Sequence, residues 1–187
     1  MSSILKVDQL QDSGGNEIIT SNGSGTITVN SQTFKNGITM ADQWRLTANI
    51  TANVDPISAN LERVDDASFS KIGTGMSVSS GIWSFPSTGI YQVGGVMDVQ
   101  PGSNDNILID CHVTTNNGGS YDAVWRINCG GATSLHRQGS NSTLVDVTDT
   151  SNVKVKFVAG SITSPSVILG DTDFNRTNFT FIRLGDT

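Results

Sequence analysis

Residues 81–99 read Gly81-Ile-Trp-Ser-Phe-Pro-Ser-Thr-Gly-Ile-Tyr-Gln-Val-Gly-Gly-Val-Met-Asp-Val99. In the second half of this stretch, apolar residues take alternate positions and polar residues fall between them. The apolar positions are Tyr91, Val93, Met97 and Val99, and the polar ones are Gln92 and Asp98. A period of two is that of a β-strand with one face buried and the other in water, so this stretch predicts an antiparallel sheet.

The same alternation recurs further along the chain, with clusters of turn residues at intervals of roughly ten positions. The inward positions predicted in three more runs are Ile107, Ile109, Cys111 and Val113; Ala123, Trp125, Ile127 and Cys129; and Val153, Val155 and Phe157. Lys154 and Lys156 alternate with the last set, as in a sheet with one face in water. Many short strands at this spacing are typical of a β-sandwich or barrel.

The run from residue 179 to 184 differs because it is apolar on both faces. Phe179 and Phe181 lie on one face, and Ile182 and Leu184 lie on the other. A strand of a two-sheet monomer normally has one face in water, so the second apolar face needs a cover. We expect that cover to be another subunit, with these four residues at the interface. A loop of the same chain is the alternative.

The composition suits one β-domain with an appendage. The chain has 187 residues, of which 36% are hydrophobic and 15% charged, a length that suits a single core of about 130 to 150 residues. Its net charge of -6 argues against a nucleic-acid partner, because neutralising phosphates requires clustered Lys and Arg. No stretch approaches the roughly 20 apolar residues of a membrane span, so we expect no membrane insertion.

Residues 1–36 are predicted to form a separate attachment segment, and residues 37–187 the main domain. The segment has short β-like runs at 4–10, 17–20 and 26–30, divided by Gly-rich turns. Such runs are too short to build a core of their own and therefore need a partner. The candidate anchor residues are Ile4, Leu5, Val7, Leu10, Ile18 and Ile19.

The stretch 81–93 resembles the C1q/TNF-like jelly roll, whose signature includes an aromatic-Pro-x-x-Gly-aliphatic-Tyr run. The positions that match the signature and the family's core are Trp83, Phe85, Pro86, Gly89 and Tyr91. Residues 144–155 are similar to the family's paired strands near the C-terminus, although 148–152 departs from its short Gly-Asp turn, and 179–184 is similar to its closing strand. The resemblance implies an all-β, antiparallel, two-sheet jelly-roll sandwich of roughly ten strands, associated as a homotrimer.

Residues 4–16 and 43–47 resemble segments of tailed-phage virion proteins of the marine or cyanophage type. This resemblance implies a non-enzymatic structural protein, assembled in the host cytoplasm and displayed on the virion surface. A head decoration or cement protein, or a short fibre, fits the short chain. The attachment segment would bind other capsid or tail proteins. The alternative is a tail-fibre module that binds a host receptor or a host surface glycan.

Two cysteines and two histidines could suggest a zinc site or a disulfide. Strand alternation puts Cys111 and His112 on opposite faces, so they could not share a metal. A hairpin turning near Asn117-Gly118 pairs Cys111 with Val124 or Trp125. Cys129 would then lie roughly 13 Å along the strand, beyond the ~7 Å that a disulfide allows. We expect two buried free thiols.

The other chemically active residue types also favour structural roles. Asp65, Asp66, Asp105, Asp171 and Asp173 could bind calcium, but their spacing matches no EF-hand, and turn capping is the favoured interpretation. No Ser lies in a GxSxG motif, and the histidines have no evident orienting partner. The tryptophans could form a sugar platform, but core packing is favoured for them. We therefore predict no catalytic residue, metal or cofactor.

Overall fold

The computed structural model describes residues 9–24, 27–29, 37–102, 105–131 and 135–187. The regular elements in these ranges are all β-strands, and the contacts divide the chain between Gly37 and Ile38 into two units. The first unit is an antiparallel sheet in the order β1 (Gln9–Gln11), β2 (Glu17–Ser21), β3 (Ile27–Val29). The Asp12 carboxylate closes the turn between β1 and β2 by accepting the amides of Gly14 and Asn16. No helix in the described ranges could span a membrane.

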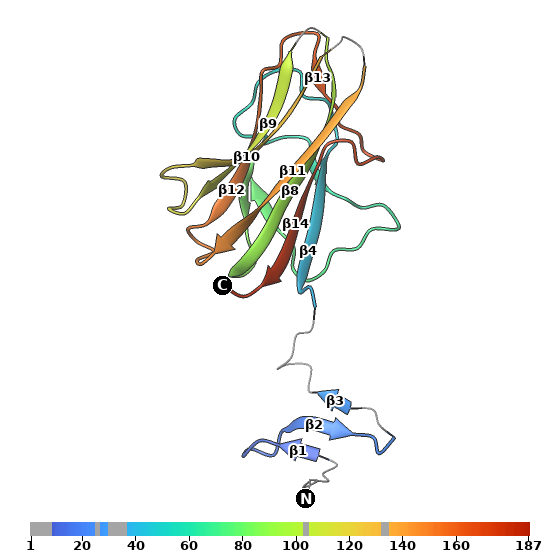
Figure 1. Cartoon of the computed structure of the whole chain (residues 1–187), viewed down its shortest axis with the longest axis vertical. Helices are drawn as coiled ribbons and strands as arrows, with labels where there is room; N and C mark the ends of the chain where they lie inside the picture. The colour runs from blue at the N-terminus through green and yellow to red at the C-terminus, as the bar shows by residue number, and fades with distance from the viewer. Residues whose placement is uncertain (1–8, 25–26, 30–36, 103–104, 132–134) are drawn as a thin grey trace, which may run out of the picture. The chain divides into compact units, whose positions relative to one another are not determined.

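The second unit consists of two facing antiparallel sheets (Figure 1). The first, called the β8 sheet here, has the order β11 (Arg137–Val147), β8 (Gly89–Gln100), β14 (Asn178–Gly185), β4 (Met40–Leu46), β5 (Leu61–Arg63), and the short β13 (Val167–Ile168) also pairs with β8. The second, the β9 sheet, has the order β10 (Asp122–Gly130), β9 (Asn106–Thr114), β12 (Lys154–Gly160), β7 (Ile82–Ser84), β6 (Ser77–Ser79). The predicted antiparallel two-sheet sandwich is confirmed.

The core lies between the two sheets and is centred on Trp83. The Trp83 ring is fully buried and meets the ring of Trp44 edge-on at 5.0 Å, while Phe157 and Phe179 stack at 3.9 Å. The alternation predicted for 91–99 is confirmed, because all four of its inward side chains are 0% exposed. Aromatic pairs of this kind contribute roughly 0.5–1.5 kcal/mol each beyond their buried area.

The predicted inward position of Ala123 is wrong. In the pairing of β10 with β9, Ala123 lies opposite His112 and Trp125 lies opposite Cys111, so Val124 is an extra residue. Such a bulge reverses the direction of the side chains before it. Ala123 is therefore exposed, whereas Trp125 is buried.

The turn between β7 and β8 explains most of the signature residues. The rings of Phe85 and Tyr91 lie 4.7 Å apart, and the Tyr91 hydroxyl donates to the carbonyl of Ser87 at 2.9 Å. Gly89 has φ +140°, and a Cβ there would lie 2.4 Å from the carbonyl oxygen of Gly185, so only glycine fits. The core assignment of Pro86 is wrong, because its side chain is exposed on the turn.

Candidate functional site

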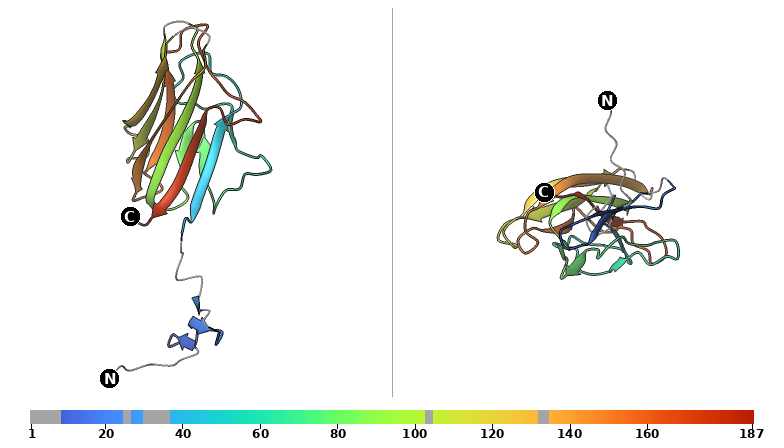
Figure 2. Two further views of the ribbon diagram at one scale, coloured as in Figure 1. Left: turned by 45° about the vertical axis from the view of Figure 1, so that its right-hand side comes forward. Right: turned by 90° about the horizontal axis from the view of Figure 1, so that it is seen from below.

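The middle of the β8-sheet face that points away from the core is an uncharged surface. Figure 2 shows β8 in green, β14 in red and β4 in cyan side by side across it. We call this surface the outer face. Its residues, all at least partly exposed, are Ala41, Gln43, Gln92, Gly94, Val96, Ser140, Ser142, Leu144, Thr180 and Ile182. None of these residues carries a charge, although the chain has a net charge of -6, and the exposed Asp146 lies on the next row beyond Leu144.

The structure corrects half of the predicted interface. Phe179 and Phe181 are 0% exposed and pack on Trp83 and Phe157, so they belong to the core of a single chain. Ile182 is partly exposed on the outer face, and Leu184 is 47% exposed at the end of β14. The alternation was correct, but it did not show which of the two faces lies inside. Only Ile182 and Leu184 remain candidates for an interface.

A hollow lies near the centre of the outer face, where β8 carries Gly94. It is an open depression of about 410 Å³, lined by Gly94, Gly95, Val96, Ser140, Asn141, Ser142 and Thr180. Leu144 stands beside it on β11 and is 62% exposed. The outer face thus carries a depression and a protruding aliphatic side chain next to each other.

At the β4 end of the outer face, a segment of the same chain provides cover. The side chain of Arg45 is 1% exposed, and its guanidinium contacts Glu62 at 2.7 Å, Asp65 at 2.7 Å and Asp66 at 2.9 Å. Burial alone would lower the pKa of Arg45, but the hydrogen bond to Glu62 and the charge of Asp66 raise it above its usual value. At this end of the sheet, β5 and the residues that follow it cover Arg45.

Asp42 is a buried carboxylate beside this segment that accepts five hydrogen bonds from four residues, one of them from the amide of the adjacent Gln43 at 3.0 Å. Arg63 donates to it from Nε at 2.9 Å and Nη2 at 3.1 Å, Trp44 donates from Nε1 at 3.0 Å, and the amide of Met76 donates at 2.8 Å. The Arg63 guanidinium also lies 4.6 Å over the Trp44 ring. These bonds tie β4 to β5 and to the start of β6, so Asp42 has a structural role.

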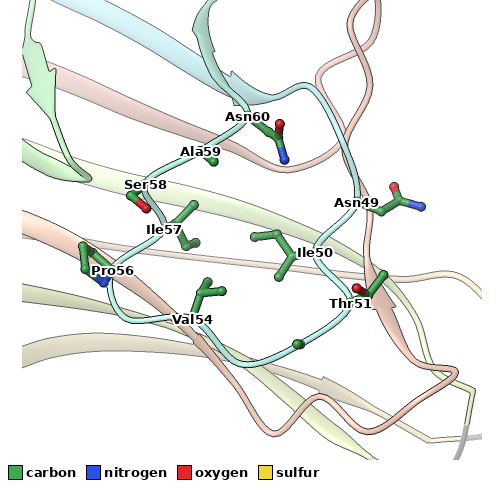
Figure 3. Close-up of a pocket in the computed structure, with 10 residues that line it drawn as sticks. Asn49, Ile50, Thr51, Val54, Pro56, Ile57, Ser58, Ala59 and Asn60 are labelled. Carbon is green, nitrogen blue, oxygen red and sulfur yellow. The ribbon is translucent and has the colours of Figure 1, made fainter.

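A small pocket lies within the loop between β4 and β5 (Figure 3). The loop is closed by a hydrogen bond from the Thr47 amide to the Asn60 carbonyl at 2.8 Å. Ile50, Val54 and Ile57 point toward one another inside it, and the pocket measures about 230 Å³. That volume is below the roughly 300–1,000 Å³ of typical ligand sites.

The candidate calcium ligands act as caps and ion-pair partners. The Asp171 carboxylate accepts the amide of Asp173 at 2.9 Å, and the Asp105 carboxylate accepts the amide of Thr163 at 2.7 Å. Asp65 and Asp66 bind Arg45, as described above. In the described part of the chain, no three acidic, His or Cys side chains are arranged to hold a metal ion.

Each histidine has a carboxylate neighbour that the sequence did not reveal. His112 Nε2 lies 3.8 Å from Asp110, and His136 Nδ1 lies 3.7 Å from Asp98. Both separations exceed a hydrogen bond. Asp110 is instead held by two bonds of 2.6 Å from Arg126. An arginine-bound carboxylate is not available to orient an imidazole as in a catalytic triad.

The thiols of Cys111 and Cys129 are free and buried. Trp125 is paired with Cys111, which confirms one of the two predicted registers, and Cys129 is paired with Ile107. Burial raises the pKa of both thiols, and nearby carboxylates add to the shift. Neither thiol is therefore suited to act as a nucleophile at neutral pH.

The candidate anchor residues lie in the first unit. Ile4, Leu5 and Val7 lie outside the described residues. Leu10 is 49% exposed on β1, and Ile18 and Ile19 are partly exposed on β2. Within this unit, these apolar side chains are left in contact with solvent.

Sequence reasoning missed the roles of three residues. Asp42 has the same strand parity as Met40, Trp44 and Leu46, which could have marked it as a buried charge. Leu144 has the opposite parity to the buried Val145, which could have marked it as an outward apolar residue. No comparable signal predicted the three partners of Arg45, because they come from positions 17, 21 and 20 residues away.

The fold is similar to those of several solved proteins, although no family model and no curated protein matches the sequence. The TNF protein Eiger from S. frugiperda is 10% identical with a TM-score of 0.60, over 81% of this chain and 96% of that one. The globular domain of zebrafish complement 1qA is 9% identical with a TM-score of 0.54, over 79% and 99%. Vertex protein P5 of PRD1 is 20% identical over 80% and 99%, but its TM-score of 0.49 supports no conclusion. These likenesses establish the expected TNF/C1q jelly-roll fold and nothing further.

Proposed function

We propose that this chain is a non-enzymatic viral structural protein that works as a homotrimer on the virion surface. The observation that carries the proposal is the outer face of the β8 sheet. The middle of this face is uncharged and includes the exposed side chain of Leu144 and the partly exposed side chain of Ile182. Such a surface favours association with another copy of the same acidic chain, because like charges would not meet across it. The resemblance to C1q/TNF jelly rolls favours a threefold arrangement.

The first unit is proposed to bind the particle. Its three short strands form a sheet that is too small to bury the apolar side chains of Leu10, Ile18 and Ile19. A sheet of this kind gains stability by docking onto a larger surface, such as a capsid or tail protein. Three linked copies would raise the effective concentration of each anchor and make weak single contacts durable. A head decoration or cement protein, or a short fibre, would need such an anchor.

A non-enzymatic role agrees with the chemistry of the described residues. The carboxylates nearest the histidines are bound to arginines, and the cysteines are buried with raised pKa values. The pocket between β4 and β5 is lined mainly by aliphatic and small polar side chains. These arrangements favour a role in assembly.

The proposal is tested first by the oligomeric state. Sedimentation equilibrium of residues 1–187 should give a mass three times that of the chain across the micromolar range. A folded monomer at these concentrations would overturn the proposal.

The anchor is tested by removing residues 1–36. The shortened chain should still form trimers, because the outer face lies entirely in the second unit, but it should no longer incorporate into virus particles. Incorporation would be followed by mass spectrometry of purified particles after complementation with the tagged chain. Normal incorporation of the shortened chain would contradict the anchor assignment and leave the trimer intact.

Host recognition is a second candidate function, favoured by exposed apolar side chains on two loops. Phe174 is 65% exposed and Leu135 is 53% exposed, and such groups are suited to contact a partner surface. If residues 37–187 adsorb to host cells or bind glycans on an array, and Phe174→Ser abolishes that binding, recognition becomes the leading function. An absence of binding would leave assembly as the function.

A further inference from the structure

The outer face carries a protrusion and a hollow on neighbouring rows of side chains. Leu144 is opposite Gln92 in the pairing of β11 with β8, and Ser142 is opposite Gly94 in the next row along. Leu144 is 62% exposed. The hollow exists because Gly94 has no side chain and its neighbours Ser140, Ser142 and Thr180 are short. A protruding aliphatic group and a hollow of about 410 Å³ are complementary in shape.

The two features cannot meet within one chain. Leu144 and Gly94 lie on the same face of one sheet, so the leucine side chain points in the same direction as the mouth of the hollow. A side chain that fills the hollow must therefore come from another molecule. A surface that covers Leu144 must likewise come from another molecule.

The charge of this surface indicates that the other molecule is a second copy of this chain. The row of Leu144 and the row of Gly94 contain no charged residue, in a chain with a net charge of -6. A basic partner would find only the Asp146 carboxylate, on the next row, to pair with, whereas a second acidic copy meets no repulsion in these two rows. In addition, β11 is the edge strand of the β8 sheet, so Leu144 stands at a border that a neighbouring subunit can reach.

We propose that Leu144 of each subunit inserts into the hollow at Gly94 of the next subunit. This inference rests on the homotrimer proposed above. Protrusion and hollow are different patches, so the contact is heterologous, and a threefold rotation closes it into a ring in which every leucine and every hollow is used once. Gly94 then has a defined role, which is to leave room for the partner's leucine.

The test is a size exchange across the contact, read out by sedimentation equilibrium. Leu144→Ala should raise the protein concentration at which half of the chains are trimeric by roughly 10- to 100-fold, because each trimer loses three buried aliphatic side chains. Gly94→Val should weaken the trimer by filling the hollow. The double variant should be tighter than either single variant, because the valine occupies the space that the shortened Leu144 leaves.

Two further variants keep the test decisive. A Cβ at Gly94 would lie 3.2 Å from the Cβ of Ser142, so Ser142→Val, which fills the hollow from the other strand, replaces Gly94→Val if that chain does not fold. Leu135→Ala removes an exposed leucine elsewhere and should leave the trimer unchanged.

The possible outcomes separate the two proposals. A wild-type chain that is monomeric overturns the trimer itself. A wild-type trimer that Leu144→Ala does not weaken shows that Leu144 is outside the interface. Strictly additive effects in the double variant show that Leu144 does not enter the Gly94 hollow. In the last two cases the homotrimer stands.

Discussion

At the scale of single residues, the carboxylate of Asp42 is expected to be the most sensitive polar group of the second unit. Asp42→Ala removes the buried acceptor of the Arg63 guanidinium and the Trp44 indole, both of which are partly exposed. Losing the acceptor of a partly buried donor costs about 1–3 kcal/mol. The free energy of unfolding, measured by urea denaturation with tryptophan fluorescence, should fall by that amount.

The matched control for Asp42 is Asp122→Ala, which removes an exposed carboxylate at the start of β10. We expect a change of no more than about 0.5 kcal/mol for it, as for most surface substitutions. Equal losses for the two variants would show that the bonds of Asp42 do not stabilise the fold.

The two cysteines should be unreactive in the native protein. Burial raises the pKa of both thiols, so the thiolate that attacks a disulfide reagent is scarce at neutral pH. With Ellman's reagent at pH 7.5, we expect no fast release of chromophore from the folded chain and two equivalents after unfolding in guanidinium. Fast reaction of one thiol in the folded chain would show that its site opens to solvent.

At the scale of strands, the adjacent glycines Gly94 and Gly95 of β8 point to opposite faces of the sheet and have different roles. Gly95 faces the core, where an added Cβ would lie 2.9 Å from the Trp125 ring and 3.4 Å from the Phe179 ring. Gly95→Ala should lower the free energy of unfolding by about 1–3 kcal/mol through overpacking. Gly94→Ala, on the opposite side of the same strand, is the comparison variant and should cost the single subunit less, because only the Ser142 side chain must shift. Both variants are therefore melted at concentrations at which the chain is monomeric. Thermal melts of both variants measure the two losses of stability, and a loss for Gly94→Ala as large as that for Gly95→Ala would contradict the packing argument.

The stability of the turn between β11 and β12 should decrease at acid pH, because Asp149 becomes protonated. Hydrogen bonds from Ser151, and then from Asn152, lower the pKa of the Asp149 carboxyl. A lowered pKa means that the ionised form stabilises the turn above the unfolded pKa of about 4, and that this contribution is lost as the pH falls through the folded value. An NMR titration should therefore show Asp149 titrating at lower pH in the folded chain than in a peptide of residues 147–154. Equal titration midpoints would contradict this.

At the scale of the whole molecule, the two units should unfold separately. Every residue of the hydrophobic core lies between Met40 and Phe181, within the second unit. Deleting residues 1–36 should therefore leave the midpoint of the main thermal transition unchanged to within about 2 °C. Calorimetry of the full and shortened chains measures this, and a large drop would show that the first unit contributes to that core.

The alternation of apolar residues predicted much of the fold because each strand buries one face. It placed Tyr91, Val93 and Phe157 correctly, but it could not foresee the bulge at Val124, which depends on how β10 meets β9. It also assigned Phe179 and Phe181 to an interface, because a two-sided strand does not reveal which side is the interior. The ion pairs of Arg45 and Asp42 lay beyond prediction, since their partners are brought together only by the pairing of β4 with β5.

The place of β14 in the β8 sheet also bears on how the chain is made. β14 follows every other strand in the sequence, yet it lies between β8 and β4 and pairs with both. A growing chain on the ribosome can form the hairpin of β9 and β10 early, but it must hold β4 and β8 apart until β14 emerges. Until then both strands have unpaired edges that invite aggregation. Synthesis that stops short of residue 178 would leave the centre of the sheet empty, so premature termination should yield chains for proteolysis and keep defective subunits out of assembly.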